Sequence, residues 1–286
     1  MVDTTTDRNP TADPAEHNAF FPSPYSLSQY TAPKTNFDGL ATDEKYTGDR
    51  WKILVIATEE RYMLMENGTF FSTGNHPVET LLPLHHMAEA GYGIDVATVG
   101  GAPGKFEWWA FPKEDEAIKS AWQATSEAFK APKRLGDLLS EGLDDYAAIF
   151  IPGGHGAMNG IPFSKDVQQV LDFFLETDRL IITLCHGPAV FRAGGLDREK
   201  NPFAGYKIVA FPDSLDFGAN IEIGYLPGLM PWKLGATLEA EGIEVVNDDM
   251  SGATTRDRNV LTGDSPLAAN QLGKESVAAL LEKFGN

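Results

Sequence analysis

The sequence contains very little cysteine, since Cys185 is the single one among 286 residues. One cysteine excludes an internal disulfide, which fits a reducing compartment. No apolar run approaches the roughly 20 residues that a membrane-spanning helix needs. Residues 1–20 are polar and lack the apolar core of a secretory signal. We therefore expect a cytoplasmic protein without a membrane segment.

Positive charge is also scarce. The 23 lysines and arginines face 41 aspartates and glutamates, so the formal net charge is −18. Binding to a phosphate backbone needs a basic face, so we do not expect direct binding to nucleic acid. A small neutral substrate remains compatible with this charge, and solubility is its simplest explanation.

The chain begins with an irregular stretch and continues with a regular one. Residues 1–50 are rich in Pro, Thr, Asp and Ser, and we interpret them as an arm whose aromatic residues pack on the body. Residues 51–286 alternate strand and helix patterns and predict one α/β domain. Strands are expected over 52–58, 92–99, 146–152, 179–184, 206–211, 243–247 and 259–263, and helices over 77–90, 164–177, 231–241 and 265–284. This alternation predicts a mostly parallel sheet with helices on both faces.

Residues 101–145 interrupt the alternation. They contain the aromatic run KFEWWAFP, which starts at Lys105, followed by a charged helical stretch. We interpret the segment as an inserted cap or small subdomain beside the active edge of the sheet. A dimer contact or a surface decoration would explain it as well.

Cys185 follows the apolar, β-branched run RLIITL and precedes Gly187 and Pro188. This pattern predicts a buried strand, a tight turn and a helix, with the thiol exposed on the turn above the sheet. The geometry resembles the nucleophile elbow of hydrolases. A nearby helix N-terminus would favour the thiolate and lower the pKa of the cysteine. The alternative is an inert buried thiol, which is the usual state of a free cysteine.

A glycine-rich turn follows the strand predicted at 146–152, with the sequence PGGHG. Ligands of open parallel sheets bind beyond the carboxyl ends of the strands. The backbone N–H groups of Gly154 and His186 could therefore form an oxyanion hole, although many such turns have no function.

Three side chains could assist the thiol. Glu79, at the start of a helix, would have its pKa raised in a half-buried cleft and could move protons, or it could simply interact with the helix dipole. His186 adjoins Cys185, although neighbours on a tight turn rarely face each other. Asp216 could orient His186, and Asp213 is an equal candidate on these grounds.

Several motifs together give a specific resemblance. The segments AAIFIPGGHG and LCHGP resemble the ThiJ/PfpI superfamily. The segments NAFFPSPYSLSQY, FSTGNHPVETLLPL, KFE and LTGDSPLAAN are similar to its HchA-type branch, and the similarity covers nearly the whole chain. Members of this branch are described as glyoxalase III, as protein deglycase and as heat-shock holding chaperone.

The resemblance implies a flavodoxin-like, doubly wound α/β core, a small added domain and a homodimer. It also implies a catalytic triad of Cys185, His186 and Asp216, with Glu79 as the carboxyl partner of the thiol. It thereby favours Asp216 over Asp213.

The chain departs from this branch at a metal site. Bacterial members carry a His/Glu/His site, whose positions match Ala88, Gly93 and Thr125 here. None of these is a metal ligand, so we expect no metal and no other cofactor. A displaced site near His85 and His86 is the alternative.

The expected activity is conversion of a 2-oxoaldehyde such as methylglyoxal or glyoxal to a 2-hydroxy acid without glutathione. Related deglycase activity would act on glycated proteins. Two other classes remain open: a cysteine peptidase or amidase, and a chaperone that binds unfolded proteins through apolar surface.

Overall fold

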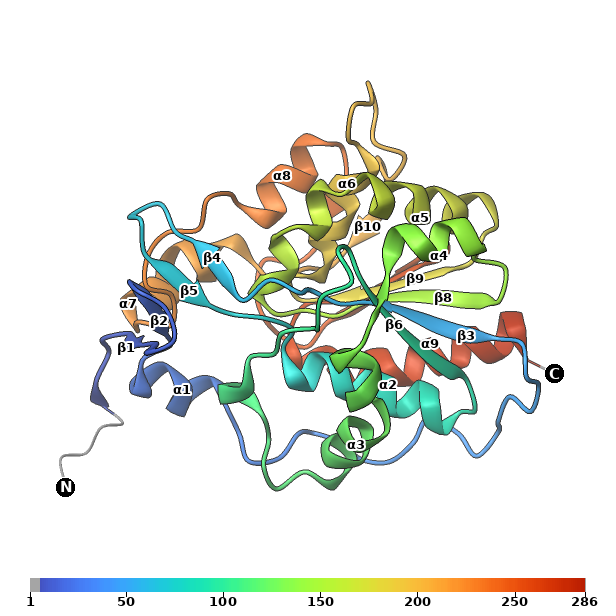
Figure 1. The fold of residues 1–286 in the computed structure, drawn as a ribbon, viewed down its shortest axis with the longest axis horizontal. Coiled ribbons are helices and arrows are strands. Elements are labelled where there is room, and N and C mark those ends of the chain that lie inside the picture. Colours follow the sequence, from blue (N-terminus) through green and yellow to red (C-terminus); the bar gives the residue numbers. More distant parts are fainter. Residues whose placement is uncertain (1–5, 286) are drawn as a thin grey trace.

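The computed structural model describes residues 6–285, and its centre is a seven-stranded sheet (Figure 1). The strand order is β12-β13-β9-β8-β3-β6-β7. The strands are β3 (Lys52–Ile56), β6 (Gly93–Thr98), β7 (Lys133–Arg134), β8 (Tyr146–Ile151), β9 (Leu180–Leu184), β12 (Thr254–Asp257) and β13 (Val260–Gly263). All neighbours are parallel except β12, which runs antiparallel to β13. The predicted mostly parallel α/β sheet is confirmed.

The strands at the centre of the sheet are apolar on both faces because helices cover both. Alternate residues of β3 and β8 enter two separate hydrophobic clusters. Leu54 and Ile149 belong to one cluster, and Ile53 and Phe150 to the other. A strand buried on both faces has no solvent-exposed side to supply polar residues, which explains its continuous apolar sequence.

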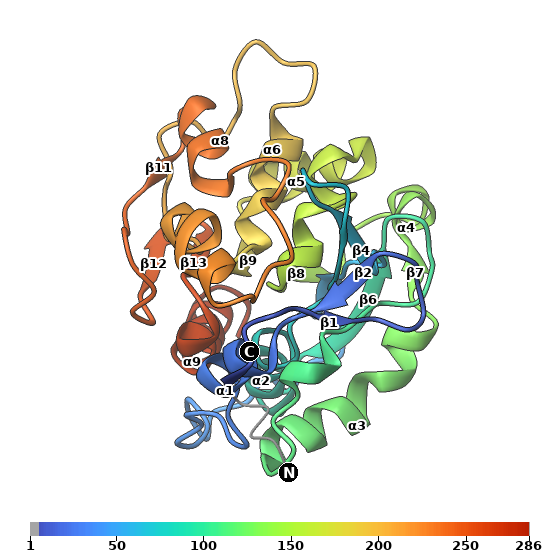
Figure 2. The same ribbon diagram turned by 90° about the vertical axis from the view of Figure 1, so that its left-hand side faces the viewer.

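Each cluster has its own helices (Figures 1 and 2). One face is covered by α2 (Pro77–Glu89), α3 (Glu116–Lys130) and α9 (Ala269–Phe284). The other face is covered by α4 (Leu135–Glu141), α5 (Lys165–Glu176), α6 (Phe191–Gly194) and α8 (Leu234–Ala240). The hydroxyl group of Ser164 caps α5 by accepting a hydrogen bond from the Val167 amide at 3.3 Å.

The N-terminal arm forms short elements: β1 (Thr11–Ala12), β2 (Ala19–Phe21) and α1 (Pro24–Tyr30). Its strands join β4 (Tyr62–Leu64) and β5 (Phe70–Ser72) in a second sheet of order β1-β2-β5-β4. In Figure 1 this second sheet lies beyond the carboxyl end of β3. The arm therefore packs beside the carboxyl ends of the parallel strands.

Residues 101–145 contribute to both layers. They contain the 3₁₀ helix Trp108–Ala110, the helices α3 and α4, and the edge strand β7. The aromatic run packs internally, with Phe106 in edge contact with Trp122 and Phe129. Trp108 stays 45% exposed. The assignment of this segment as a cap stays a prediction.

The late strands are shorter than the sequence predicted. Only β10 (Lys207–Ile208) and β11 (Glu244–Val245) form within 206–211 and 243–247, and they pair with each other outside the main sheet. Side chains take the place of strand partners further along. The Val209 amide donates to the Thr262 hydroxyl, and the Ala210 amide donates to the Asn247 side chain.

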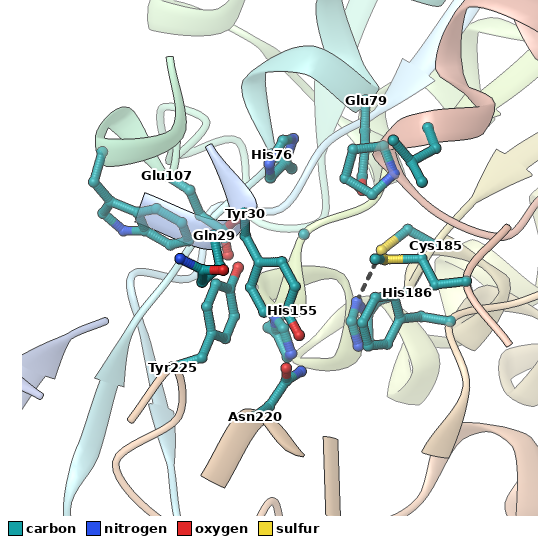
Figure 3. A pocket seen from close by; sticks show the side chains of 16 residues that line it. Gln29, Tyr30, His76, Glu79, Glu107, His155, Cys185, His186, Asn220 and Tyr225 are labelled. Carbon is teal, nitrogen blue, oxygen red and sulfur yellow. Dashed lines mark hydrogen bonds between the residues drawn. The ribbon is translucent and has the colours of Figure 1, made fainter. Parts of the chain in front are cut away.

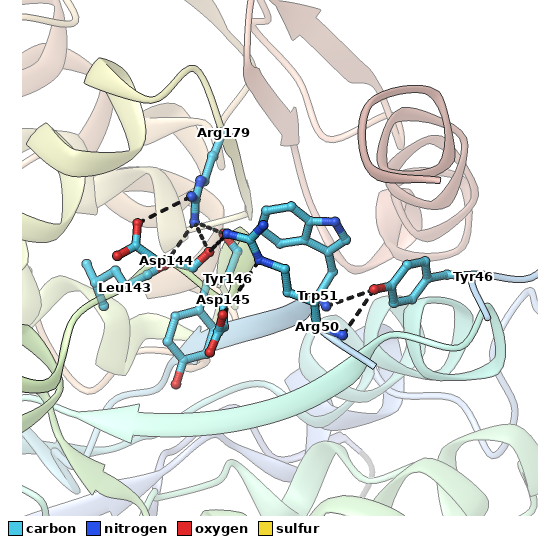
Figure 4. A network of polar contacts seen from close by, with 8 residues as sticks. All are labelled: Tyr46, Arg50, Trp51, Leu143, Asp144, Asp145, Tyr146 and Arg179. Carbon is cyan, nitrogen blue, oxygen red and sulfur yellow. Dashed lines mark hydrogen bonds and ion pairs between the residues drawn. The ribbon is translucent and has the colours of Figure 1, made fainter. Parts of the chain in front are cut away.

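Arg179 organises the opposite end of the sheet (Figure 4). Its Nη1 donates to the backbone oxygens of Leu143, Asp144 and Tyr146 at 2.7–2.9 Å. The guanidinium also lies 5.2 Å from the ring centroid of Trp51. These contacts hold the amino ends of β3, β8 and β9 together, away from the edge where ligands bind. Within residues 6–285, no helix has the length and apolar character needed to cross a membrane.

Candidate active site

A cavity of about 270 Å³ lies at the carboxyl ends of the parallel strands (Figure 3). Segments after β5, β6, β8 and β9 contribute to its wall, together with α1 of the arm. The polar lining residues are Gln29, Tyr30, His76, Glu79, Glu107, His155, Cys185, His186, Asn220 and Tyr225. Trp109, Phe211, Met250, Pro266 and Leu267 supply most of the apolar wall. Four of the five predicted site residues line this cavity: Glu79, Gly154, Cys185 and His186. The fifth, Asp216, lies behind His186.

Cys185 sits on a strained turn directly after β9. Its φ angle is +59°, an uncommon value for a residue other than glycine. The Cys185 amide donates to the Gly263 oxygen at 2.8 Å, and its own oxygen accepts from the Phe211 amide at 2.9 Å. The predicted elbow is therefore present. The sequence predicted a helix after this turn, and the structure has the 3₁₀ helix Gly187–Val190 followed by the single turn of α6.

The expectation of an exposed, acidified thiol is wrong. Cys185 is only 4% exposed, and burial together with the neighbouring Glu79 raises the pKa of its thiol well above the ordinary value. The short 3₁₀ turn cannot offset the cost of placing a thiolate in this enclosed space beside a carboxyl group. The backbone N–H of Gly154 acts in the opposite direction and favours the thiolate. Enclosure of Cys185 therefore favours the neutral form of its thiol.

Glu79 occupies the first turn of α2 and is wholly buried, where the sequence predicted a half-buried cleft. Burial, reinforced by the nearby Glu107 carboxyl, raises the pKa of Glu79 well above its usual range. Within residues 6–285, neither of its carboxyl oxygens has a hydrogen-bond partner. Glu79 is therefore a protonated acid beside the thiol, able to give and take a proton.

His186 faces Cys185 despite their adjacency in sequence. The Cys185 Sγ lies 3.2 Å from His186 Nδ1, and His186 Nε2 lies 2.7 Å from Asp216 Oδ2. The strained backbone of Cys185 turns its side chain towards the following residue, which a regular turn would not do. Asp216 stands in the π-helix Leu215–Ala219, a type of element that often occurs at functional sites.

The structure also separates the two candidate aspartates. Asp216 is 1% exposed and contacts His186, whereas Asp213 accepts hydrogen bonds from the amides of Gly235 and Ala236. Asp213 thus supports the first turn of α8. The spatial arrangement brings Asp216 to the site and places Asp213 outside it.

The sequence pattern did not identify His155 as a site residue, although His155 belongs to the PGGHG turn. His155 Nε2 lies 3.0 Å from Asp216 Oδ1, and the ring centroids of His155 and His186 are 3.9 Å apart. Asn220 Nδ2 donates to the same Oδ1 at 2.8 Å. The signal that could have identified His155 was its position on a glycine turn directly after a buried strand.

Glu107 is a second buried carboxyl group that was not singled out. Its Oε1 accepts a hydrogen bond from Thr73 at 2.7 Å. Burial raises the pKa of Glu107 to about 7, and the nearby His155 acts in the opposite direction. A parallel bridge between Asn75 and Phe106 sets Glu107 beside the loop that precedes α2. Glu107 and Glu79 therefore reach one cavity from two different segments.

Gly154 has a φ angle of +96°, which a glycine adopts without strain. Its backbone N–H group lies near both Cys185 and Glu79 and lowers the pKa of each. The role of Gly154 and His186 as oxyanion donors stays a prediction.

The residues at the metal positions implied by the resemblance do not fit a metal. Ala88 and Gly93 carry no donor atom, and the Thr125 hydroxyl donates to the Ala121 oxygen of its own helix. His85 and His86, the alternative metal ligands, do not point at a common site. His86 Nε2 contacts Asn270, and the ring centroids of the two histidines lie 6.3 Å apart.

Among the side chains of residues 6–285, one group of three or more His, Cys, Asp or Glu is close enough to share an ion. It consists of His155, His186 and Asp216. Both histidines contact Asp216 at hydrogen-bond distance, so these three side chains are already hydrogen-bonded to one another.

Comparison with known proteins places these observations in a family. The model of the DJ-1/PfpI family matches residues 70–202. The protein/nucleic acid deglycase HchA of Staphylococcus aureus (strain JH9) is 58% identical over 282 residues, which cover 98% of this chain and 97% of the relative. The HchA deglycase of Staphylococcus aureus strain bovine RF122 is 57% identical, and the match again covers 98% of this chain and 97% of the relative.

Solved structures share the fold at lower identity. Glyoxalase III of Candida albicans aligns with a TM-score of 0.65 at 24% identity, covering 80% of this chain and 97% of that one. The DJ-1 protein of Schizosaccharomyces pombe aligns with a TM-score of 0.51 at 16% identity, covering 82% and 92%.

Proposed function

Because the chain belongs to the DJ-1/PfpI family, we propose that it converts 2-oxoaldehydes such as methylglyoxal to 2-hydroxy acids without glutathione, and that it acts as a deglycase on related adducts. The observation that carries the proposal is the single cysteine on a strained turn, enclosed with His186 and Glu79 in one small cavity. This combination supplies a nucleophile, a base and an acid.

The first step forms a carbon–sulfur bond. His186 Nδ1 accepts the thiol proton as Sγ attacks the aldehyde carbon. Glu79 gives its proton to the aldehyde oxygen, which becomes the hydroxyl group of a hemithioacetal, and Glu79 is left as a carboxylate that can act as a base. The N–H groups of Gly154 and His186 would stabilise the negative charge on that oxygen. Asp216 orients the imidazole ring through its 2.7 Å contact with Nε2.

The second step is an internal oxidation and reduction. A base removes the proton from the former aldehyde carbon, and a proton is returned to the neighbouring carbonyl carbon through an enediol. Glu79 is placed for this transfer beside Cys185, and His186 is the alternative. The first carbon becomes a thioester and the second becomes a secondary alcohol, so no external oxidant is needed.

Water then completes the reaction. It adds to the thioester carbon, the carbon–sulfur bond breaks, and the sulfur regains its proton. The product from methylglyoxal is lactate. A deglycase reaction would begin with the same attack by Sγ on an early adduct of an aldehyde with an amine or a thiol.

The cavity favours small neutral substrates. Among its lining residues in the described part of the chain there is no lysine or arginine to bind a phosphate group. The name of the Staphylococcus aureus relatives includes nucleic acid, so the substrate range of this chain needs direct measurement. The small enclosed volume and the buried thiol disfavour peptides, which supports the glyoxalase reading over a cysteine peptidase. Chaperone activity and a homodimer stay predictions.

The decisive experiment compares the wild-type protein with Cys185→Ala after removal of glutathione. We expect the wild type to convert methylglyoxal to lactate, detected by NMR, and the variant to lose this activity while staying folded. Mass spectrometry of the wild type at early times should detect the covalent adduct. Turnover by Cys185→Ala near the wild-type rate would exclude the covalent mechanism.

A further inference from the structure

Two histidines share one buried carboxylate in this site. His155 and His186 contact different oxygens of Asp216, at 3.0 and 2.7 Å, and all three residues are at most 3% exposed. We infer that His155 is a positioning residue that partly neutralises Asp216 and thereby keeps His186 as a neutral base facing the thiol. This inference rests on the proposed function, since it concerns the base of that reaction.

The hydrogen bonds define where the protons lie. An ionised carboxylate can only accept, so both Nε2 atoms that contact Asp216 carry protons. When His186 is neutral, its lone pair is therefore on Nδ1, which lies 3.2 Å from Sγ of Cys185. This tautomer is the one that can accept the thiol proton.

The charge cannot be placed on both rings at low cost. Their centroids are 3.9 Å apart, and two imidazolium ions at this distance repel strongly in a buried site. Asp216 offers one negative charge for the pair, so one of the two rings carries the additional proton more readily than the other.

The surroundings place that proton on His155. Asp216 and the nearby Glu107 carboxyl outweigh burial and raise the pKa of His155. Burial and the charge on His155 lower the pKa of His186. The other titratable groups around the pair are His76, Glu79, Cys185, Tyr30 and Tyr225, and Asp213 acts on His186 from outside the cavity. Asp213 favours the charged form of His186 but is outweighed.

Removing the charge of His155 should raise the pKa of His186, because the negative charge of Asp216 would then act on His186 alone. His186 would become protonated at higher pH, and an imidazolium ion cannot accept the proton of Cys185. The acid limb of the activity profile should therefore move to higher pH.

The test uses His155→Gln in the full chain. Glutamine places an amide N–H near the position of Nε2 and can keep the contact with Asp216, but it carries no charge. We expect the acid limb of kcat/KM for methylglyoxal to move up by about one pH unit. Asn220→Ala is the matched control, since it removes a neutral donor from the same Oδ1 and should shift the limb less.

Histidine NMR gives a readout that does not depend on turnover. In the wild type near pH 7, ¹⁵N shifts should show His155 as the cation and His186 as the neutral form protonated at Nε2. In His155→Gln the titration of His186 should move upward, and the same should hold on a Cys185→Ala background. A cationic His186 beside a neutral His155 in the wild type, or an unshifted titration and pH profile in a folded variant, would overturn the inference.

The two proposals fail in different ways. If Cys185→Ala kept the wild-type rate, the covalent mechanism would fall, while the NMR titration would still report on the histidine pair. If the mechanism held and the titration of His186 did not move, only the role of His155 would fall. Should His155→Gln not fold, the wild-type ¹⁵N shifts alone decide the assignment.

Discussion

Glu79 and Cys185 lie on either side of Gly153, so close that the glycine has no room for a side chain. A methyl group built on Gly153 would overlap Glu79 Oε2 and would lie 2.7 Å from the Cys185 Cβ. The acid and the nucleophile come from α2 and from the end of β9, and Gly153 from the loop after β8. Their proximity therefore depends on the absence of one side chain.

Substitution of Gly153 by alanine should separate the acid from the thiol. We expect Gly153→Ala to lower kcat for methylglyoxal by a factor of ten or more and to reduce the free energy of unfolding by about 1–3 kcal/mol through overpacking. Steady-state kinetics and urea unfolding measure the two effects. Gly218→Ala is the control for stability, because no atom lies within 4 Å of the position of its new methyl group. Wild-type kinetics in Gly153→Ala would contradict the proposed geometry.

Glu79→Gln tests proton transfer with little change of shape. Glutamine cannot exchange a proton, so we expect kcat to fall by about 10²–10⁴-fold. The pKa of Cys185 should change little, because glutamine, like the protonated Glu79, carries no charge. Iodoacetamide alkylation against pH measures this pKa. Glu89→Gln at the exposed end of the same helix is the control. If Glu79→Gln kept most of the wild-type rate, His186 would have to move the proton alone.

His76 should make the protein sensitive to acid. Burial lowers its pKa in the folded state from 6.5 to about 3. As the pH falls below 6.5, the His76 imidazole gains a proton in the unfolded chain but stays neutral in the folded chain. The free energy of unfolding should then fall by up to about 1.4 kcal/mol per pH unit until about pH 3.

The matching variant is His76→Asn, since asparagine does not titrate here and is a good cap for α2. Urea unfolding between pH 6.5 and 4 should show a shallower loss of stability in the variant. An identical slope in the two proteins would show that His76 does not contribute.

Chelation should leave the activity intact. Ala88, Gly93 and Thr125 supply no ligand set, and the mechanism uses only side chains and water. After dialysis against a chelator, methylglyoxal turnover should match that of untreated protein, and added zinc should not bind at this position. Elemental analysis showing about one zinc per chain, lost in His85→Ala or His86→Ala, would reveal the displaced site.

Much of the architecture could be read from local sequence. Apolar β-branched runs bounded by glycines predicted β3, β6, β8 and β9, because a strand buried on both faces has no polar positions. The elbow was also predictable, since strand, cysteine and Gly-Pro follow one another directly. The short strands β10 and β11 were overestimated because side-chain hydrogen bonds from distant residues replace part of their pairing.

The chemical state of the site was not predictable in the same way. The pKa of Cys185 depends on burial and on Glu79, which is 106 positions away along the chain and adjacent in space. The choice between Asp213 and Asp216 depends on the π-helix, which turns Asp216 inward, whereas Asp213 precedes this helix and contacts α8. The roles of His155 and of the arm residue Tyr30 in the cavity wall depend on how separate segments pack.

The sequence alone therefore determined the fold class, the position of the candidate nucleophile on its turn and the family resemblance, because these reside in short contiguous patterns. Tertiary structure decided the protonation of the thiol, the second histidine on Asp216 and the enclosure of the cavity. These properties arise from desolvation and from charges that meet only when segments distant in sequence pack together.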